Sequence, residues 1–259
     1  MNPIIQLEGV CKVFTGEGTP IIALDQVDLD IPRGKFTVLI GPSGCGKSTL
    51  LYMMAGFEKP TSGVIYLDGD PIVKPGPDRG FVFQDYALFP WKTVLGNVMF
   101  GLETTGWKKK DAEAKAREYI KMVNLEGFEH AYPHTLSGGM KQRVGIARAL
   151  AYQPNVLLMD EPFGALDAQT RKFMQQELER ILMQTQLSVV FVTHSVIEAV
   201  YLADRVIVFT ARPGHVKGIV EVDLPRPRRY TDDAYLDVRE QVLGLLQEEV
   251  EKEIRQDGF

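Results

Sequence analysis

The residues with the clearest chemical pattern form the loop Gly41-Pro42-Ser43-Gly44-Cys45-Gly46-Lys47-Ser48-Thr49. Glycines at these spacings let successive backbone N–H groups curl around phosphate, and a helix beginning near Lys47 adds a favourable dipole. Lys47 can then reach the outer phosphates of a nucleotide, and the Ser48 hydroxyl can coordinate magnesium. A glycine-rich turn that binds nothing is the alternative, but it explains neither the lysine nor the hydroxyl. The loop therefore predicts a site for nucleotide phosphates and Mg²⁺.

Two adjacent carboxylates follow the apolar run 156–159. Asp160 and Glu161 should lie at the carboxyl edge of a sheet, where open α/β folds bind ligands. We expect Asp160 to organise magnesium with its waters, and Glu161 to act as a general base toward an attacking water. A strand ending in Asp-Glu can instead be a solvated turn or a helix cap. Together with the lysine loop, the pair predicts that the nucleotide is ATP and that it is hydrolysed.

A second turn of small residues, Ser137-Gly138-Gly139, opens a predicted helix and could bind phosphate at its N-terminus. With the flanking residues of 136–143, it resembles the signature motif of ATP-binding cassette (ABC) proteins. Met140 departs from the family pattern, whose commonest form has glutamine there, but the serine and both glycines are kept. The resemblance extends from about residue 7 to 222, and it implies that this turn contacts ATP held by a second subunit.

The same resemblance assigns roles to four further residues. It implies that Gln84 touches magnesium and the attacking water, that His194 contacts the γ-phosphate, and that Asp167 lies in a loop crossing the dimer interface. Asp167 could also cap the helix that follows it, and a lone histidine at a strand end is usually structural. Phe14 resembles the aromatic that stacks on adenine, with Phe36 in that role, or a core position for Phe14, as alternatives.

The elements that must position these residues predict an α/β fold. Apolar runs at 36–40, 80–83, 156–159, 189–193 and 206–210 indicate a mostly parallel sheet flanked by helices, the core of a P-loop NTPase. Alternating patterns in 4–31 and 64–67 indicate an antiparallel β subdomain. Between about 91 and 150 the chain is rich in Ala, Glu, Lys and Met, which favours an inserted helical subdomain.

We therefore expect an ABC nucleotide-binding domain over residues 1–222, followed by a connector and an amphipathic helix over 223–259. Prolines in 224–229 prevent regular helix in the connector. The helix after it carries an apolar stripe, which can face its own domain, as is usual, or a partner surface. The stripe consists of Val238, Val242, Leu245, Leu246, Val250 and Ile254.

Composition and charge narrow the class of protein. The 259 residues are 45% hydrophobic, and 29 basic against 34 acidic residues give a net charge of -5, which argues against nucleic acid as a partner. Two cysteines are too few for a disulfide framework, and this favours a reducing compartment. The N-terminus lacks a secretion signal, and charges interrupt the apolar stretch 187–209. We expect a peripheral protein on the cytoplasmic face of the bacterial inner membrane.

Transport is the process that these features favour. A P-loop kinase would leave the turn at 137–139 without a purpose, whereas a soluble ABC ATPase acting on a non-membrane partner remains the alternative. A cassette encoded alone resembles the importer arrangement, in which two ATPases, identical or paralogous, form a head-to-tail dimer on permease subunits and a solute-binding protein delivers the solute.

Two segments refine the expected partners and solute. Apolar residues in Tyr86–Trp91 could form a groove for a permease helix. The alternative is that they only pack within the helical subdomain. Segments 193–205 and 211–214 are most similar to the nitrate/sulfonate/taurine branch of importers, which implies a small, anionic solute.

Overall fold

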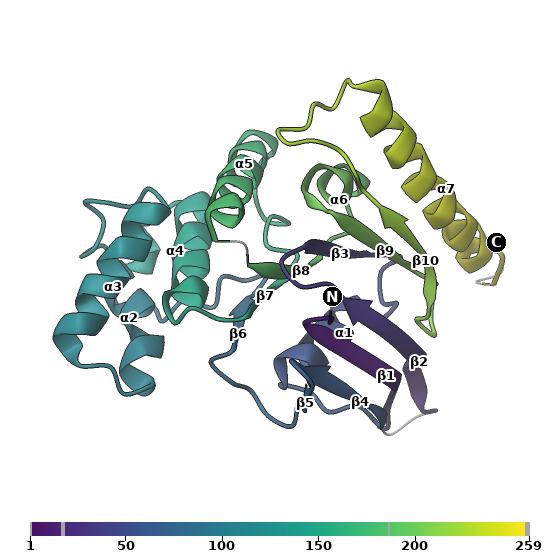
Figure 1. The fold of residues 1–259 in the computed structure, drawn as a ribbon, viewed down its shortest axis with the longest axis horizontal. Helices are drawn as coiled ribbons and strands as arrows, with labels where there is room; N and C mark the ends of the chain where they lie inside the picture. Colours follow the sequence, from purple (N-terminus) through teal and green to yellow (C-terminus); the bar gives the residue numbers. More distant parts are fainter. Residues whose placement is uncertain (1, 17–18, 186, 257–259) are drawn as a thin grey trace. The chain divides into compact units, whose positions relative to one another are not determined.

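The computed structural model describes residues 2–16, 19–185 and 187–256. The chain forms two compact units, of which the first comprises Met1–Pro75 and Ser188–Phe259 and the second comprises Gly76–Leu187 (Figure 1). The second unit is thus inserted, in sequence, between two halves of the first. The expected domain boundary near residue 222 stays a prediction.

A mostly parallel set of strands forms the centre of the first unit. In the order β10-β9-β3-β8, it contains β3 (Phe36–Ile40), β8 (Ser188–Val192), β9 (Arg205–Phe209) and β10 (Val216–Glu221). β3 pairs in parallel with both β8 and β9, whereas β10 is antiparallel to β9. Every residue of β3 and β8 is buried, as expected for parallel strands covered on both faces. β3, β8 and β9 fall on the predicted runs 36–40, 189–193 and 206–210, whereas the sequence analysis does not predict β10.

An antiparallel sheet accounts for the alternating patterns near the N-terminus. Its order is β2-β1-β4-β5, built from β1 (Ile5–Phe14), β2 (Ile21–Ile31), β4 (Ser62–Leu67) and β5 (Asp70–Pro71). The α/β fold with an antiparallel β subdomain is therefore confirmed.

Three helices complete the first unit: α1 (Lys47–Ala55), α6 (Val196–Leu202) and α7 (Asp233–Gln256). α7 packs against α6, β9 and β10, with Val242 fully buried, so the described part of its apolar stripe faces its own unit. The side chains of Val250 and Ile254 lie outside the described residues. No helix among the described residues is both long enough and apolar enough to cross a membrane.

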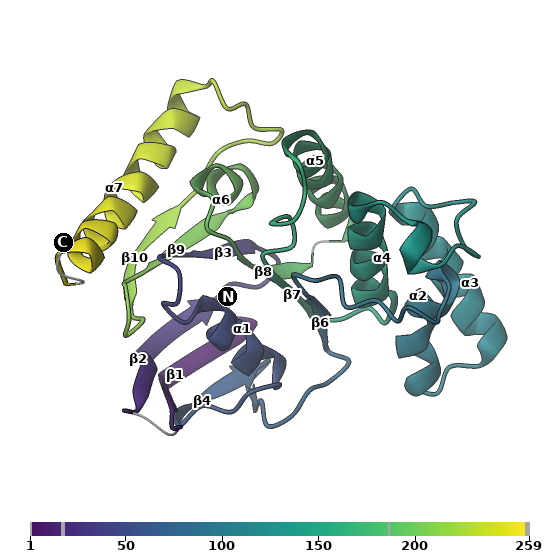
Figure 2. The ribbon, with the colours of Figure 1, turned by 180° about the vertical axis from the view of Figure 1, so that it is seen from behind.

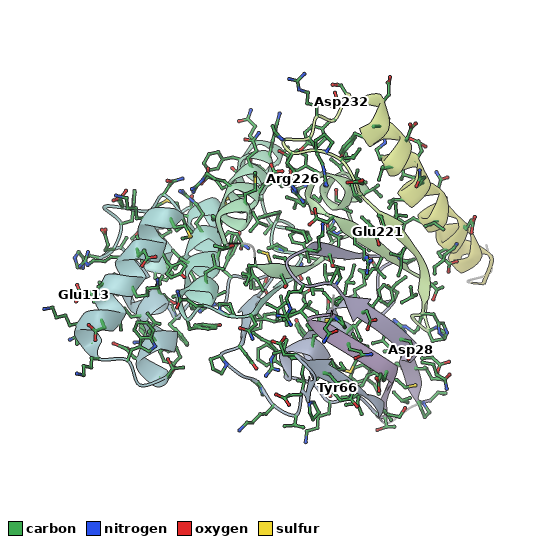
Figure 3. All side chains as sticks on the ribbon, viewed as in Figure 1. Asp28, Tyr66, Glu113, Glu221, Arg226 and Asp232 are labelled. Atoms are coloured by element: carbon green, nitrogen blue, oxygen red, sulfur yellow. The ribbon has the colours of Figure 1, made fainter. Side chains whose placement is uncertain are left out.

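The connector before α7 is anchored by two arginines. Arg228 is 6% exposed and donates hydrogen bonds to carbonyls that include those of Val200, Tyr201 and Ala203 at the end of α6. Arg226, labelled in Figure 3, donates to the Asp204 carboxylate at 3.0 Å. Because the last carbonyls of a helix lack helical partners, the Arg228 guanidinium satisfies acceptors that would otherwise be buried unpaired.

The second unit pairs two parallel strands, β6 (Arg79–Val82) and β7 (Val156–Asp160), and its other described elements are helices joined by loops. α2 (Val94–Thr104), α3 (Lys109–Met122) and α4 (Gly138–Ala151) pack on one another (Figure 2), with a 3₁₀ turn at Pro133–Thr135 before α4. α5 (Ala168–Thr185) follows β7. Thr93 caps α2 by accepting the Gly96 N–H at 3.1 Å, which fixes where the first of these helices begins.

Candidate active site

The phosphate loop joins β3 to α1 in the first unit. Gly44 and Gly46 have φ of 74° and 96°, in the left-handed region that favours glycine. At Gly46 there is also no room for a side chain, since an added Cβ would lie 2.9 Å from the Ala23 carbonyl oxygen. The helix α1 begins at Lys47, as the sequence predicts.

Lys47 is held inside this loop. Its side chain is buried, and Nζ donates to the carbonyls of Gly41 at 2.8 Å and Pro42 at 2.7 Å. The Cys45 thiol is fully buried beside it, with Sγ 3.5 Å from Lys47 Nζ. Burial raises the pKa of the Cys45 thiol, although the neighbouring ammonium partly offsets the rise. The loop therefore presents a fixed cation together with a neutral thiol.

His194 lies at the same edge of the parallel strands as the phosphate loop. β8 runs parallel to β3, with Leu39 beside Val192, so the residues that follow both strands emerge side by side. Thr193 donates its hydroxyl to the buried Glu198 carboxylate at 2.6 Å and accepts the Ser195 N–H at 3.0 Å. Both neighbours of His194 are thus tied to the start of α6, while His194 itself is exposed.

The two aromatic candidates for adenine stacking differ in exposure. Phe14 is 42% exposed at the end of β1, with Lys12 Nζ 5.0 Å from its ring centroid. Phe36 is 4% exposed and packs on Phe191 in the core, with ring centroids 5.6 Å apart. A ring enclosed in the core cannot stack on a ligand, so the geometry favours Phe14 over Phe36.

In the second unit, parallel pairing brings Gln84 and Glu161 together. β6 and β7 are in register at Val82 and Met159, and each candidate follows two residues later. A Cβ built on Gly164 would lie 3.8 Å from Glu161 Oε2 and 3.9 Å from Gln84 Nε2. Glu161 has a φ of 40°, which is a strained conformation for a residue with a side chain and is typical of functional sites.

Asp160 ends β7 and is 3% exposed. Its carboxylate, the Gln84 amide and the Ser48 hydroxyl are oxygen donors, and oxygen donors are the ligands that Mg²⁺ prefers alongside phosphate and water. Each of these groups is therefore of a kind that suits magnesium bound with a nucleotide.

The turn at 137–139 is closely packed within the second unit. Ser137 caps α4 by accepting the Met140 N–H at 3.3 Å. A Cβ on Gly138 would lie 3.1 Å from the Tyr86 hydroxyl, and one on Gly139 would lie 2.8 Å from Thr170 Cγ2. The glycines are therefore needed for the close approach of neighbouring elements.

Asp167 caps α5, in agreement with one of its two expected roles. Its carboxylate accepts hydrogen bonds from the N–H of Gln169 at 3.1 Å and of Thr170 at 3.0 Å, and from the Thr170 hydroxyl at 2.7 Å. These bonds from Thr170 and Gln169 lower the pKa of Asp167. Thr170 thus contacts both Asp167 and Gly139, a link that the sequence analysis did not predict.

Arg148 is a second residue that sequence reasoning missed. From α4, its guanidinium donates to the carbonyls of Ala87 at 2.6 Å and Tyr86 at 3.0 Å. These two residues have φ of 45° and 58°, so the arginine holds a strained turn just after Gln84. Burial lowers the pKa of Arg148. No local pattern could reveal this role, because the acceptors are backbone carbonyls some 60 residues away.

Together, the parallel strands, the glycine loop with its lysine and the strand-end carboxylates define the chain as a P-loop NTPase. Comparison with known proteins gives the family. A family model described as "ABC transporter" matches residues 24–164. The chain belongs to the ABC transporter family, and it is an ATPase that uses ATP with Mg²⁺, as the sequence predicts.

Three relatives align over most of their length. An uncharacterized ABC transporter ATP-binding protein of Methanocaldococcus jannaschii is 52% identical, over 98% of this chain and 96% of the relative. An aliphatic sulfonates import ATP-binding protein of Bacillus cereus is 43% identical, over 94% and 98%. A nitrate import ATP-binding protein of Synechocystis is 48% identical, over 85% and 83%.

Solved structures agree with this placement. A dimeric bacterial ABC transporter cassette is 35% identical, with a TM-score of 0.76, over 85% of this chain and all of that chain. A dimeric post-hydrolysis state of an ATP-binding cassette, bound to ADP and Pi, is 34% identical with a TM-score of 0.75 over the same shares. The cbiO1 protein of Clostridium perfringens, part of a transporter complex, is 28% identical with a TM-score of 0.76, over 86% and 90%.

Proposed function

We propose that this chain is the motor subunit of an importer for a small anionic solute. The observation that carries the proposal is its similarity, over at least 83% of each chain, to ATP-binding proteins of sulfonate import and of nitrate import. Sulfonates and nitrate are both small anions. The substrate sites of such a system lie in its permease and solute-binding protein, so the class of solute is the finest statement that this subunit supports.

In this proposal, the phosphate loop from Gly41 to Thr49 binds the phosphates of ATP, and Lys47 contacts the outer two. Ser48, Asp160 and Gln84 would hold magnesium. Bound magnesium would neutralise charge on the transferred phosphoryl group. The half-buried Glu161 accepts a proton from the attacking water, and the exposed His194 donates a hydrogen bond to the γ-phosphate.

We further propose that a complete site needs two copies of the ATPase, or this chain and a paralogue, arranged head to tail. The turn Ser137-Gly138-Gly139 of one copy would contact the ATP held by the loop of the other, with Asp167 at the interface. The dimeric state of a solved relative that is 35% identical supports this arrangement. The exposed Ser137 hydroxyl and the N-terminus of α4 supply groups that favour an anion.

The segment Tyr86–Trp91 is the proposed contact with the permease. Trp91 is 71% exposed, while Phe89 packs on Phe100 with ring centroids 4.5 Å apart. The segment therefore has an anchored half and an accessible half, which suits a surface that receives a short apolar helix and transmits its motion. Binding there would place the chain at the cytoplasmic face of the membrane as a peripheral subunit, beside a system that includes a solute-binding protein.

Uptake by living cells tests the import role. Deleting the gene should abolish uptake of one radiolabelled anion from a panel of nitrate, taurine, other sulfonates and bicarbonate, and the wild-type gene should restore it. Unchanged uptake of every anion, together with co-purification of a soluble protein in place of a permease, would favour a cassette that acts away from membranes.

Glu161→Gln tests the chemistry separately from the import role. The amide keeps the shape of the side chain but cannot accept the proton, so we expect phosphate release to fall by roughly 10² to 10⁴-fold. ATP binding and ATP-dependent dimerisation, followed by calorimetry and light scattering, should persist. Normal steady-state turnover by this variant would remove Glu161 from the proposed role.

A further inference from the structure

The turn between β9 and β10, residues 210–215, contacts the backbone of the phosphate loop at Gly44 and Cys45. Arg212 Nε donates to the Gly44 carbonyl at 3.3 Å, and a Cβ on Gly44 would lie 2.7 Å from Arg212 Nη2. The backbone of Gly214 approaches the next carbonyl so closely that a Cβ there would collide with the Cys45 oxygen. Two successive carbonyls of the phosphate loop therefore face this turn.

This orientation determines where the N–H groups of the loop point. In a trans peptide, the C=O of one residue and the N–H of the next point in opposite directions. Because the carbonyls of Gly44 and Cys45 face the turn, the N–H groups of Cys45 and Gly46 face away from it. These are among the donors that a phosphate loop directs at its ligand. A cation on the Gly44 carbonyl also polarises that peptide and strengthens its N–H as a donor.

The turn itself is rigidly held on the side of β2. The Gly214 N–H donates to the Ala23 carbonyl at 2.9 Å, and the Gly214 carbonyl accepts the Asp25 N–H at 3.3 Å. Within the turn, the Thr210 hydroxyl donates to the Pro213 carbonyl at 2.9 Å and accepts the His215 N–H at 3.0 Å. The backbone that carries Arg212 therefore has a fixed position.

The C-terminal helix supplies the remaining support. Glu249 of α7 is 2% exposed, and its carboxylate accepts the Ala211 N–H at 3.1 Å, next to Arg212. The other carboxylate oxygen of Glu249 accepts from Lys217 of β10 at 2.8 Å. A buried carboxylate is stable only when it is paired and hydrogen-bonded, so Glu249 is held in one position between the Ala211 N–H and Lys217. It connects α7 to the phosphate loop through a single turn of the chain.

We propose that Arg212 is a positioning residue for ATP binding, fixed in place by Glu249 of α7. It orients the Gly44–Cys45 peptide so that the phosphate loop presents its donors before the nucleotide arrives. The inference rests on the proposed role of the phosphate loop, and it assigns the C-terminal helix a function in nucleotide affinity.

The central test is nucleotide affinity measured by calorimetry for wild type, Arg212→Ala and Arg212→Lys. We expect Arg212→Ala to raise the Kd for ATP and for ADP about threefold to tenfold, the loss of one exposed charge-assisted hydrogen bond. The bound ground state and the transition state lose this hydrogen bond equally. KM should therefore rise while kcat stays within about twofold of wild type. Arg212→Lys keeps a cationic donor and should recover part of the affinity. Wild-type affinity in Arg212→Ala would overturn the proposal.

Arg205→Ala is the matched control from the same hairpin. Arg205 pairs with Glu221, labelled in Figure 3, at 2.6 Å on the strands beyond the turn. We expect its removal to leave the Kd unchanged. An equal loss of affinity in Arg205→Ala would mean that the hairpin acts only through general stability, which would also overturn the proposal.

Glu249 variants test the support from α7. Glu249→Gln keeps an oxygen that can accept the Ala211 N–H, so its Kd should stay near that of wild type, whereas Glu249→Ala should match Arg212→Ala. The double variant Arg212→Ala, Glu249→Ala should bind no more weakly than the weaker single variant, because both changes act on one contact. Additive losses of affinity in the double variant would show that Glu249 of α7 does not act through Arg212. If Glu249→Ala does not fold, the affinities of the Arg212 and Arg205 variants decide whether Arg212 positions the phosphate loop.

Lys47→Ala distinguishes failure of this inference from failure of the proposed site. If Lys47→Ala loses nucleotide binding while Arg212→Ala does not, only the role of Arg212 fails. If Lys47→Ala binds ATP like wild type, the proposed phosphate site is wrong, and the inference fails with it.

Discussion

Gln84 and Glu161 approach the same point of the backbone from two parallel strands, because the side chains of both lie beside Gly164. The glycine leaves a space about one methyl group wide between an amide and a carboxylate. In the proposed reaction, this is where an attacking water would be oriented by both side chains.

Gly164→Ala should therefore fill that space without unfolding the chain. A Cβ there would contact the Glu161 carbonyl oxygen at 3.4 Å, which is ordinary van der Waals contact. We expect the free energy of unfolding to change by less than about 0.5 kcal/mol. Turnover should fall on the order of tenfold to 100-fold, because a methyl group displaces the water. Wild-type turnover, measured by phosphate release, would show that the water lies elsewhere.

Gly139→Ala should destabilise the second unit. The added methyl would lie 2.8 Å from Thr170 Cγ2, and overpacking of this kind costs about 1 to 3 kcal/mol. The second change Thr170→Ser removes that methyl but keeps the hydroxyl that donates to Asp167, so it should restore most of the loss. Urea unfolding of both variants is the measurement. A double variant as unstable as Gly139→Ala would place the clash elsewhere.

Arg148→Met should loosen the turn that follows Gln84. The change keeps the apolar length of the side chain but removes the donors to Tyr86 and Ala87, and we expect a loss of about 1 to 3 kcal/mol. Hydrogen exchange should speed up at 86–91, and co-purification of the permease should weaken while ATP binding persists.

The control for this variant is Arg117→Met on the surface of α3, where Arg117 pairs with Glu113 at 2.8 Å. Exposed pairs contribute little, so stability should change by less than about 1 kcal/mol. Equal exchange rates at 86–91 in wild type and Arg148→Met would contradict the role given to Arg148.

Cys45 should react slowly with thiol reagents. The thiolate is the reactive form, and burial raises the pKa of Cys45, so the folded chain holds little thiolate at pH 7. In a Cys11→Ser variant, iodoacetamide labelling followed by mass spectrometry should be slower than in urea. It should accelerate as the pH rises toward the raised pKa of Cys45 and slow further with ATP. Equal labelling with and without urea at pH 7 would refute this.

The same shift makes a prediction for stability. A pKa raised by folding means that the folded chain binds the proton more tightly than the unfolded chain. The stabilisation is complete below the ordinary value of about 9 and is lost as the pH rises through the folded value. Relative to Cys45→Ser, the wild type should therefore lose free energy of unfolding only in that alkaline range, as measured by urea titration.

Local patterns in the sequence are enough to predict a strand such as β3 and the glycine-rich loop that follows it. The run at 36–40 is uniformly buried and the loop after it needs glycine conformations, so both constraints act on adjacent residues. The meeting of Gln84 with Glu161 is also predictable in outline, because residues that follow neighbouring parallel strands emerge at one edge.

The supporting contacts could not be predicted in this way. Arg148 and Arg212 donate to backbone carbonyls about 60 and 168 residues away. Every residue offers such a carbonyl, so no residue type marks the acceptor. The packing of Thr170 against Gly139 likewise depends on how two helices approach each other. Contacts of this kind arise from tertiary structure alone.

The second unit is inserted between the two halves of the first, and this order affects how the chain folds during its synthesis on the ribosome. β3 is an entirely buried strand whose neighbours β8 and β9 begin about 150 and about 170 residues later. At roughly 5 to 20 residues per second, the apolar residues of β3 wait on the order of 10 to 30 s for their partners. The second unit is complete before β8 emerges and can fold first. During that interval, an unpaired apolar strand is exposed to aggregation, which makes the nascent chain a natural client for chaperones.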